Sequence, residues 1–487
     1  MDNLSTLNSQ LSTLYFLGIG GIGMSAIARY FKAKGFEVAG YDRTSTVLTR
    51  ELEAEGIKIN YVDEVEAIPS EFRGIDTDAE NLSTSNNSSS ILGDVAKPKG
   101  GELSTLVVYT PAIPTDNKQY QYFANNGFRM MKRAAILGEI TRLERGLCIA
   151  GTHGKTTTST MTAHILKQSH VDCNAFLGGI SKNYTSNLLL SDDSDLVVIE
   201  ADEFDRSFHH LSPYMAVITS TDADHLDIYG THEAYLESFA HFTSLIVDGG
   251  VLFVKKGIQL DARISDKVTL YTYSGTEQAD FYADNIRLGS GQLLFDFVTP
   301  NERIADVELG VPVMINVENA VAAMSIAYLN GVTADELRAS MASFAGIRRR
   351  FDFHLKSDRL TVIDDYAHHP MELEASLKSV NALYADKKIV VVFQPHLYTR
   401  TRDFYREFAS ALSCANQVVV VEIYPARELP IEGITSQLII DQVTSPVKRL
   451  TTKAELIDTL KTLEFDVLLT VGAGDIDTYI PQIVKSL

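Results

Sequence analysis

Cysteine is scarce in this sequence: Cys148, Cys173 and Cys414 are the only three among 487 residues. Their odd number and wide separation give neither a disulfide framework nor the spacing of metal ligands. We therefore expect reduced thiols that fill the core of an intracellular protein.

Positive charge and long apolar runs are also lacking. The 43 Lys and Arg residues are outnumbered by 63 Asp and Glu residues, and the formal net charge is −20, which argues against a general binder of nucleic acid. No apolar run approaches the roughly 20 residues that span a membrane, and residues 1–5 lack the features of a signal peptide. We expect a cytoplasmic protein of two to four domains, without nucleic-acid binding or membrane insertion.

The most informative stretch is residues 151–158, with the sequence GTHGKTTT. It follows the apolar run 147–150 and precedes a helix-forming segment, so the order is strand, glycine turn, helix. Backbone N–H groups and a helix N-terminus wrap polyphosphates in such turns. Lys155 would reach the terminal phosphates, and the Thr156 hydroxyl would bind the associated magnesium ion. Because Ile149 stands where the strict P-loop has glycine, the match is to a shortened form; an ordinary helix start is the alternative.

A second glycine turn lies near the N-terminus, where residues 18–23 read GIGGIG between a predicted strand and a predicted helix. The next predicted strand ends at Asp42, about where dinucleotide-binding folds place a ribose contact. Alone, this motif indicates a dinucleotide enzyme, and a tight turn without a ligand is the alternative.

Acidic residues follow two apolar strands of the middle region. The strand at 195–199 leads to Glu200, the usual place of a magnesium carboxylate after a P-loop. The strand at 215–219 leads to an acidic cluster around His225, which is either a second metal ligand or part of a solvated loop. Asn319 lies in the stretch 316–320, which opens an apolar helix through residue 329, and a capping role in the first turn would explain this asparagine without a ligand.

The last third of the chain carries a basic run and a set of polar strand ends. Residues 346–351 read GIRRRF, either a solvated charge run or a source of an arginine for nucleotide phosphate. Four predicted strands, which end near residues 363, 393, 421 and 469, each lead into polar residues. Since ligands bind beyond the carboxyl ends of parallel strands, a substrate crevice is expected there.

Taken in order, these stretches resemble the Mur ligases, a family that builds the peptide of bacterial cell-wall precursors. The resemblance covers nearly the whole chain except its first dozen residues and a polar insertion at 76–105. It rests on the motifs GIGGIGMS, YTPAIP, GTHGKTTT, EADEFD, DADHLD, RRRFD, DDYAHHP, FQPHLYTRTRDF, YPARE and GAGDI.

The resemblance implies an α/β fold of three domains. These are a Rossmann-like UDP-binding domain at 1–140, which includes the insertion, a central P-loop-type ATPase domain at 141–346, and a Rossmann-like C-terminal domain at 347–487. The implied reaction joins L-alanine to the lactyl carboxylate of UDP-N-acetylmuramate. It uses ATP with Mg²⁺ or Mn²⁺ and passes through an acyl phosphate. A monomer and a homodimer both remain open.

The resemblance also implies roles for individual residues. ATP is expected on Gly151, Thr152, His153, Gly154, Lys155, Thr156, Thr157, Asn319 and Arg350. The UDP-sugar is expected on Gly18, Gly20, Gly21, Gly23, Met24, Asp42, Thr110 and Ala112. Metal ligands are expected at Thr156, Glu200 and His225, and catalytic groups at Lys155, His225, Arg349, Arg350 and His368. The amino acid and muramate are expected to contact Tyr366, His368, His396, Arg400 and Arg402.

Two departures from the family pattern bear on these roles. Ser220 stands where some relatives have Asn, and Leu397 stands where some have Arg. Without that arginine, Arg400 or Arg402 becomes the expected anchor of the alanine carboxylate. Either His368 or His225 would position or deprotonate the amine.

Three other functions are alternatives to this one. A recycling ligase of the same family would attach a whole tripeptide, but the stretch at 394–402 favours the alanine enzyme. An NAD-dependent oxidoreductase would leave Glu200 and the turn at 151–156 unexplained. A P-loop regulatory protein without chemistry would have no use for the histidines at 368, 369 and 396.

Overall fold

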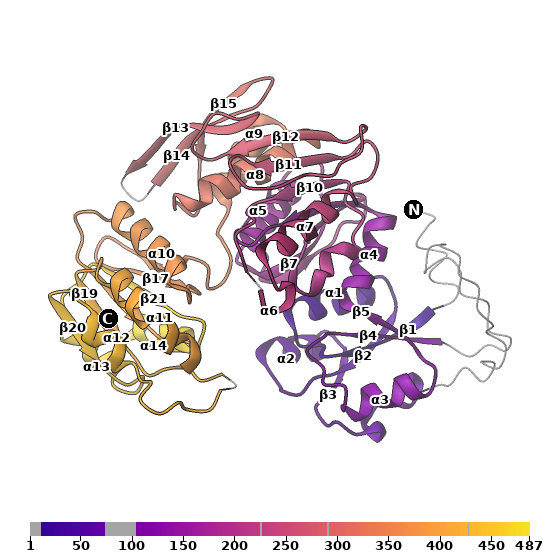
Figure 1. The fold of residues 1–487 in the computed structure, drawn as a ribbon, viewed down its shortest axis with the longest axis horizontal. Coiled ribbons are helices and arrows are strands. Elements are labelled where there is room, and N and C mark those ends of the chain that lie inside the picture. The colour runs from indigo at the N-terminus through magenta and orange to yellow at the C-terminus, as the bar shows by residue number, and fades with distance from the viewer. Residues whose placement is uncertain (1–10, 74–103, 225, 290–291, 427) are drawn as a thin grey trace. The chain divides into compact units, whose positions relative to one another are not determined.

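The computed structural model describes residues 11–73, 104–224, 226–289, 292–426 and 428–487. The chain divides into two compact units, and Figure 1 labels their helices and strands. The first unit comprises residues up to Ile180, Tyr184–Phe281 and Ala322–Leu337. The second comprises Ser181–Asn183, Tyr282–Val321 and Arg338–Leu487. The fold is α/β throughout, as predicted, and each unit is described separately.

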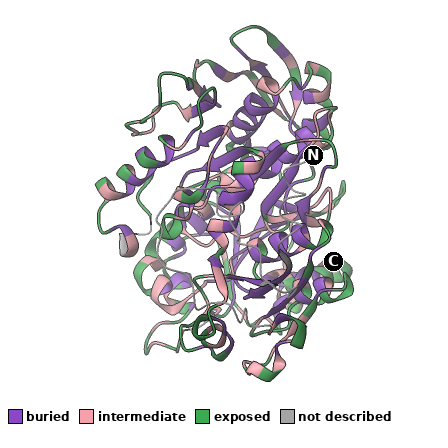
Figure 2. Ribbon diagram, turned by 90° about the vertical axis from the view of Figure 1, so that its right-hand side faces the viewer, coloured by how far each residue is buried: buried purple, intermediate pink, exposed green. Residues whose placement is uncertain are grey.

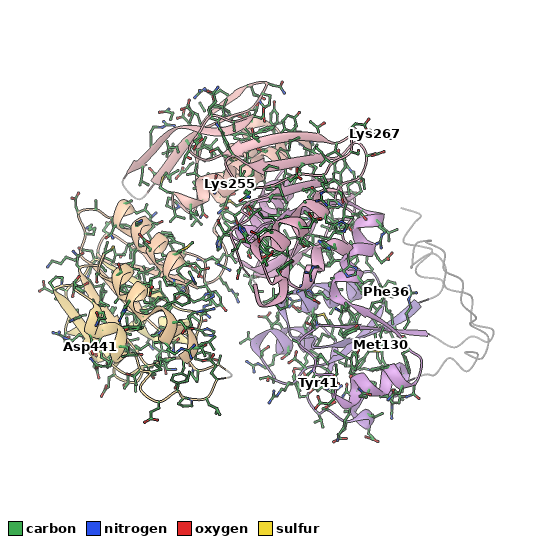
Figure 3. All side chains as sticks on the ribbon, in the orientation of Figure 1. Phe36, Tyr41, Met130, Lys255, Lys267 and Asp441 are labelled. Atoms are coloured by element: carbon green, nitrogen blue, oxygen red, sulfur yellow. The ribbon has the colours of Figure 1, made fainter. Side chains whose placement is uncertain are left out.

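The N-terminal sheet of the first unit is parallel, with the strand order β3-β2-β1-β4-β5. Its strands are β1 (Leu11–Leu17), β2 (Glu37–Tyr41), β3 (Lys58–Asn60), β4 (Ser104–Tyr109) and β5 (Arg129–Lys132). Phe36, which directly precedes β2, and Tyr41, its last residue, are both buried; both are labelled in Figure 3. Its helices are α1 (Ile22–Ala33), α2 (Val47–Ala54), α3 (Lys118–Asn125) and α4 (Arg133–Leu143). The central place of β1 puts the GIGGIG turn at the middle of the carboxyl edge.

The predicted insertion at 76–105 lies almost entirely outside the described residues. Its last two residues already belong to β4, because that strand begins at Ser104. The sheet therefore resumes slightly earlier than the composition predicts.

A second sheet of the first unit has the strand order β12-β11-β10-β6-β9-β7-β8. Its strands are β6 (Arg145–Ala150), β7 (Asn174–Ser181), β8 (Ser186–Leu189), β9 (Leu196–Glu200), β10 (Met215–Ile218), β11 (Val251–Lys255) and β12 (Thr269–Ser274). Helices α5 (Lys155–Lys167), α6 (Leu226–Tyr229) and α7 (His232–Thr243) belong to this region. The parallel neighbours β9, β6 and β10 end side by side, which places the residues after each of them at one edge.

The second unit contains two strand arrangements. An antiparallel run is formed by β13 (Phe281–Gly289), β14 (Gln292–Val298) and β15 (Arg303–Glu308). Helices α8 (Ile315–Leu329) and α9 (Ala334–Ser343) follow it in the chain, but Ala322–Leu337, which includes the end of α8 and the start of α9, belongs to the first unit.

The C-terminal sheet has the order β16-β17-β21-β18-β19-β20, and β16 alone among its described strands runs antiparallel to its neighbour. The strands are β16 (Asp352–Lys356), β17 (Thr361–Asp365), β18 (Ile389–Phe393), β19 (Gln417–Val420), β20 (Val447–Leu450) and β21 (Val467–Val471). The helices are α10 (Pro370–Leu383), α11 (Tyr398–Leu412), α12 (Gln437–Gln442), α13 (Leu456–Lys461) and α14 (Ile480–Ser486).

Burial explains why the central strands are continuous apolar runs. Parallel strands covered on both faces have no polar side, and β9, β10, β18 and β21 are buried along almost their whole length. Figure 2 colours the chain by burial, with buried residues in purple. Cys148 and Cys173 are buried, as predicted, whereas Cys414 is exposed, so the expectation of a core thiol is wrong there. In the described part of the chain, no helix combines the length and the apolar character needed to cross a membrane.

Candidate active site

The GTHGKTTT turn is fixed by the residues that follow β10. Gly151 and Gly154 have φ values of 133° and 82°, which favour glycine. A Cβ on Gly151 would overlap the Thr219 hydroxyl and lie 2.7 Å from the Ser220 backbone nitrogen. The Ser220 hydroxyl accepts a hydrogen bond from the His153 N–H at 2.8 Å. The serine at this departure position therefore has a defined task, which is to hold the turn.

Lys155 is the first residue of α5, and its ammonium lies against the turn. Its Nζ donates to the carbonyls of Gly151 at 2.6 Å and Thr152 at 3.3 Å, and to Glu203 Oε1 at 2.9 Å. The Glu203 side chain is 1% exposed. Burial raises the pKa of Glu203, and the charge of Lys155 lowers it in part. The turn thus holds a lysine whose charge is balanced by a buried carboxylate.

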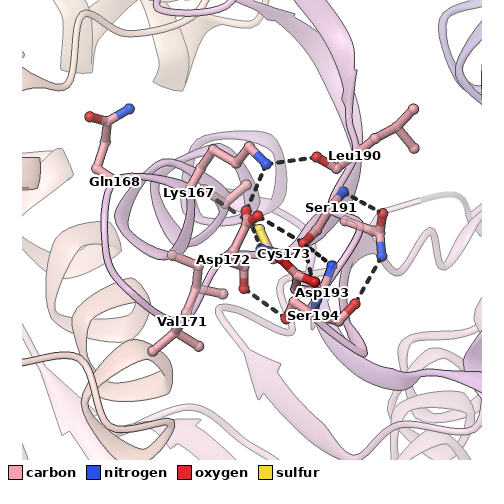
Figure 4. A network of polar contacts seen from close by, with 12 residues as sticks. Lys167, Gln168, Val171, Asp172, Cys173, Leu190, Ser191, Asp193 and Ser194 are labelled. Carbon is pink, nitrogen blue, oxygen red and sulfur yellow. Dashed lines mark hydrogen bonds and ion pairs between the residues drawn. The ribbon is translucent and has the colours of Figure 1, made fainter. Parts of the chain in front are cut away.

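The other end of α5 is anchored by a polar network (Figure 4). Lys167 Nζ donates to Asp172 Oδ1 at 2.7 Å and to the Leu190 carbonyl at 2.6 Å. Asp172 Oδ2 accepts from the Ser191 hydroxyl at 2.8 Å, and the Asp172 carbonyl accepts from the Ser194 hydroxyl at 2.9 Å. These contacts fix the helix that presents Lys155 at its start.

The acidic stretch after β9 contacts the residues around β5 and α4. Glu200 ends β9, and a Cβ on Gly178 would overlap its carboxylate, so this glycine leaves room for it. Asp202 pairs with Arg133 at 3.0 Å, and Asp205 pairs with Lys132 at 3.1 Å. Two ion pairs therefore hold the loop that carries Glu203.

Two of the three predicted metal ligands, Thr156 and Glu200, lie among the described residues. The Thr156 hydroxyl and the Glu200 carboxylate are hard oxygen donors, which suit Mg²⁺. His225, the third predicted ligand, lies outside the described residues. Among the described residues, no cluster of three or more His, Cys, Asp or Glu side chains could hold a metal ion. The ligand set stays a prediction.

The GIGGIG turn is held by Asp42. Its Oδ2 accepts from the Gly20 N–H at 2.8 Å, and its Oδ1 accepts from the Thr44 N–H at 3.1 Å. A Cβ on Gly18 would lie 2.6 Å from Thr110 Cγ2, and one on Gly23 would lie 2.6 Å from Arg133 Nη1. The turn, Asp42 and Thr110 therefore lie together at the carboxyl edge of the sheet.

The remaining residues predicted around this turn have different surroundings. Met24 is buried in α1, where it packs in the core. Gly21 is the exposed residue before α1, and Ala112 is exposed beyond β4.

In the second unit, Arg349 and Arg350 differ in their surroundings. Arg349 Nη2 donates to the Gly472 carbonyl at 2.7 Å, and its guanidinium lies 4.9 Å from the centre of the Tyr366 ring. Its Nε is 3.6 Å from Asp364 Oδ2, a carboxylate whose pKa burial raises to about 7. Arg350 is exposed, 5.5 Å from the same tyrosine ring. Arg349 is thus held within the fold, whereas Arg350 faces solvent.

His368 is the centre of an aromatic cluster at the carboxyl edge of the C-terminal sheet. Its ring lies 5.2 Å from Tyr366 and 6.1 Å from His396, which stacks on Tyr424. Burial lowers the pKa of His368, although Glu372 opposes this shift. Nδ1 is 3.0 Å from the Tyr366 carbonyl, an arrangement that favours the proton on Nδ1 and leaves Nε2 as an acceptor.

The two arginines predicted as carboxylate anchors also differ. Arg400 Nη1 is buried and has no hydrogen-bond partner among the described residues. Arg402 is exposed and donates to Asp403 at 2.7 Å. Asn319, on α8, is 9% exposed, and its amide donates to Asn316 Oδ1 at 3.2 Å.

Sequence reasoning missed two residues of the first unit. Glu203 belongs to the quoted EADEFD motif, but nothing in its spacing indicated that it pairs with Lys155, 48 positions earlier in the chain. Arg133 was not singled out at all, although it lies against Gly23 and pairs with Asp202. An arginine at the start of a helix after an edge strand gives no local signal of such contacts.

Comparison with known protein families gives three matches along the chain. Residues 13–145 match the Mur ligase family, catalytic domain. Residues 149–327 match the Mur ligase middle domain, and residues 349–474 match the Mur ligase, glutamate ligase domain.

Individual proteins match over nearly the full length. A UDP-N-acetylmuramate–L-alanine ligase of Parabacteroides distasonis is 56% identical over 98% of this chain and 98% of its own. A protein of the same name from Phocaeicola vulgatus is 55% identical over 97% of each chain. The crystal structure of UDP-N-acetylmuramate-alanine ligase from Thermotoga maritima superposes with a TM-score of 0.77 at 26% identity, covering 97% of this chain and 98% of that one.

Proposed function

Because the chain belongs to the Mur ligase family, we propose that it joins L-alanine to the lactyl carboxylate of UDP-N-acetylmuramate. ATP would drive the reaction and yield ADP and phosphate. The observation that carries the proposal is the position of Lys155, which begins α5 and whose ammonium contacts the glycine turn and Glu203. The near-full-length relatives named for this reaction support the choice of substrates.

The chemistry explains why a ligase needs such a turn. A carboxylate resists attack by an amine, so it is first phosphorylated. A carboxylate oxygen attacks the γ-phosphorus of ATP, the bond to the β,γ-bridging oxygen breaks, and ADP leaves. Lys155 and Arg350 would offset the growing charge, and Thr156 and Glu200 would supply oxygen ligands to a divalent cation that, when bound, would neutralise the phosphate oxygens. His225 stays the predicted third ligand.

The second step forms the amide. The alanine amine, as the free base, attacks the acyl carbon, and the C–O bond to phosphate breaks. His368 suits the role of proton acceptor because burial lowers its pKa and keeps the ring neutral near pH 7. Its Nε2 would take the proton while Nδ1 stays directed at the Tyr366 carbonyl.

The contacts of the two arginines separate their roles in substrate binding. We assign the alanine carboxylate to Arg400, whose Nη1 is buried without a partner among the described residues. Arg402 already has the neighbouring Asp403 as its partner. The UDP-sugar diphosphate is assigned to the GIGGIG turn, which Asp42 holds.

We place the domain boundaries near residues 140 and 346. The first boundary is supported by the end of α4 at Leu143 and the start of β6 at Arg145, and the second by the start of β16 at Asp352. The family matches, which end at 145 and begin again at 149 and 349, fall close to both positions.

The decisive experiment is release of phosphate from ATP in the presence of UDP-N-acetylmuramate, with each amino acid tested in turn. We expect release that requires both the UDP-sugar and L-alanine. Turnover without any UDP-sugar would contradict the proposal. A preference for the tripeptide over L-alanine would instead favour the recycling ligase.

A further inference from the structure

Three residues of the middle of the chain belong to the second unit, although long stretches of the first unit flank them on both sides. These are Ser181–Asn183, which we call the clasp; Ser181 is the last residue of β7. Their partners lie at and before the basic turn, which we define as Gly346–Phe351. Ser181 forms an antiparallel bridge with Ile347, and the Lys182 N–H donates to the Gly346 carbonyl at 3.0 Å.

The side chains of the clasp extend this pairing. Asn183 accepts from the Ala345 N–H at 2.9 Å and donates to the Ser343 carbonyl at 2.8 Å. Lys182 Nζ forms an ion pair with Asp352 and donates to the Phe353 carbonyl at 2.9 Å. The clasp therefore contacts the chain on both sides of the basic turn.

Asp352 connects Lys182 to the turn itself. Its side chain is 3% exposed, and its second oxygen accepts from the Arg349 N–H at 3.2 Å. His354 Nε2 lies 3.5 Å from the same oxygen. The buried carboxylate of Asp352 thus contacts both the Lys182 ammonium and the backbone N–H of Arg349.

The backbone of the basic turn needs such support. Arg349 and Phe351 have φ values of 64° and 46°, a region that non-glycine residues avoid. Backbone of this kind persists only where its surroundings fix it, and it is frequent at functional sites. The two strained residues flank Arg350, so they set the direction in which that side chain leaves the turn.

We propose that Lys182 is a positioning residue for the ligation. Through Asp352, it holds the basic turn in the conformation that keeps Arg349 within the fold and presents Arg350 to solvent. The inference rests on the proposed function, because there Arg350 offsets the charge of the transferred phosphoryl group. Lys182 itself contacts no substrate in this scheme. A buried ion pair need not add stability, so a purely structural role must be tested separately.

The first test uses Lys182→Met in the full chain, which keeps the side-chain length and removes the charge. We expect kcat for ADP formation to fall at least tenfold, while KM for UDP-N-acetylmuramate changes less than twofold. Trypsin should cut the folded variant after Arg348, Arg349 or Arg350 at least tenfold faster than the wild type, with cut sites identified by mass. Lys182→Arg should restore both properties.

Lys378→Met is the matched control. Lys378 forms an exposed ion pair with Glu374 at 2.6 Å on α10, so the same substitution removes a similar charge from the same unit. It should leave kcat and the tryptic pattern unchanged. Asp352→Asn, which is nearly isosteric, should reproduce the Lys182→Met result. The double variant should be no worse than either single one, because both remove the same interaction.

The outcomes separate the two proposals. Wild-type kcat and tryptic resistance in both Lys182→Met and Asp352→Asn would overturn the positioning role. A lower kcat without faster cleavage would also overturn it, since Lys182 would then act by another route. If Lys182→Met does not unfold cooperatively, Asp352→Asn decides the question. Absence of ligation in the wild type would refute the proposed function, and the tryptic result would still report on the clasp.

Discussion

Each of the two glycine turns of the first unit follows a strand and leads into a helix, but different side chains contact them. The GIGGIG turn leads into α1 and is fixed by Asp42, which accepts a hydrogen bond from the Gly20 N–H. The GTHGKTTT turn leads into α5 and carries Lys155, whose charge is balanced by the buried Glu203. Glycines shape the backbone in both turns, so the difference between them is Lys155 at the start of α5, and the proposed binding of ATP at the second turn depends on this charge.

The glycines of the two turns also face different neighbours. A Cβ on Gly20 would meet side-chain atoms, Thr49 Cγ2 at 2.6 Å and Asp42 Oδ2 at 2.8 Å. A Cβ on Gly151 would meet the Thr219 hydroxyl and, in addition, the backbone nitrogens of Thr219 and Ser220 at 2.9 and 2.7 Å. Side chains can rotate away, whereas strand-end backbone cannot. The second turn should therefore tolerate change less well than the first.

The largest effect is expected from removing the charge that distinguishes the turns. Lys155→Ala should lower kcat for ADP formation by on the order of 10³-fold or more, because phosphoryl transfer loses a cation at the phosphates. The measurement is coupled ADP release, with circular dichroism to show that the variant stays folded. Adding Glu203→Gln to the Lys155→Ala variant should not restore activity. Retained turnover in Lys155→Ala would mean that the phosphate site lies elsewhere.

A matched pair of glycine substitutions compares how well the two turns tolerate an added methyl group. Gly151→Ala should destabilise the protein by about 1–3 kcal/mol and abolish most activity, because φ is positive and strand-end backbone blocks the new methyl group. Gly20→Ala should cost less than about 1 kcal/mol and act mainly on KM for the UDP-sugar. Thermal unfolding and steady-state kinetics measure both. Equal losses in the two variants would contradict the contrast between them.

Removing the acid that holds the first turn should affect one substrate only. Asp42→Ala leaves the Gly20 N–H without its acceptor, and we expect KM for UDP-N-acetylmuramate to rise by about tenfold, the effect of one lost hydrogen bond. KM for ATP should stay within twofold of the wild type. A rise in KM for ATP of the same size would show that the two turns are not independent.

The smallest effect concerns pH. Burial raises the pKa of Glu203 above its ordinary 4.5 despite Lys155, so the folded chain binds this proton more tightly than the unfolded chain. Its contribution to stability is therefore greatest at low pH and falls as pH rises from 4.5 through the folded-state pKa. Glu203→Gln removes this dependence. Its Tm relative to the wild type should thus be higher at pH 8 than at pH 5; parallel Tm profiles would contradict the assignment.

Much of the fold could be predicted because it depends on local pattern. Apolar runs followed by glycine and then by helix formers predicted β1, β6, α1 and α5. The helix after the second turn begins at Lys155 itself, because Gly154 adopts the left-handed conformation that ends the turn. Strand order and sheet membership depend on contacts far apart in sequence and were not predicted.

The candidate site likewise contains residues that could be predicted from local pattern and residues that could not. The residue types of the GTHGKTTT turn predicted a phosphate ligand, because backbone N–H groups, lysine and threonine suited to phosphate and magnesium all fall within seven residues. Glu203 and Asp352 could not be recognised, because each acts through a partner 48 or 170 positions away. A residue that positions another leaves no spacing in the sequence, so only the folded chain reveals it.

The clasp constrains recombination between the gene for this protein and the genes for its relatives. The chain enters the second unit at residue 181, leaves it at 184 and crosses again near 282, 322 and 338. A single recombination crossover near 338 would join Ser181–Asn183 of one parent to the basic turn of another. Lys182 and Asp352 would then come from different lineages, and a chimaera that lost either charge would keep three intact sheets. Recombination is therefore expected to preserve this pair or to replace both members together.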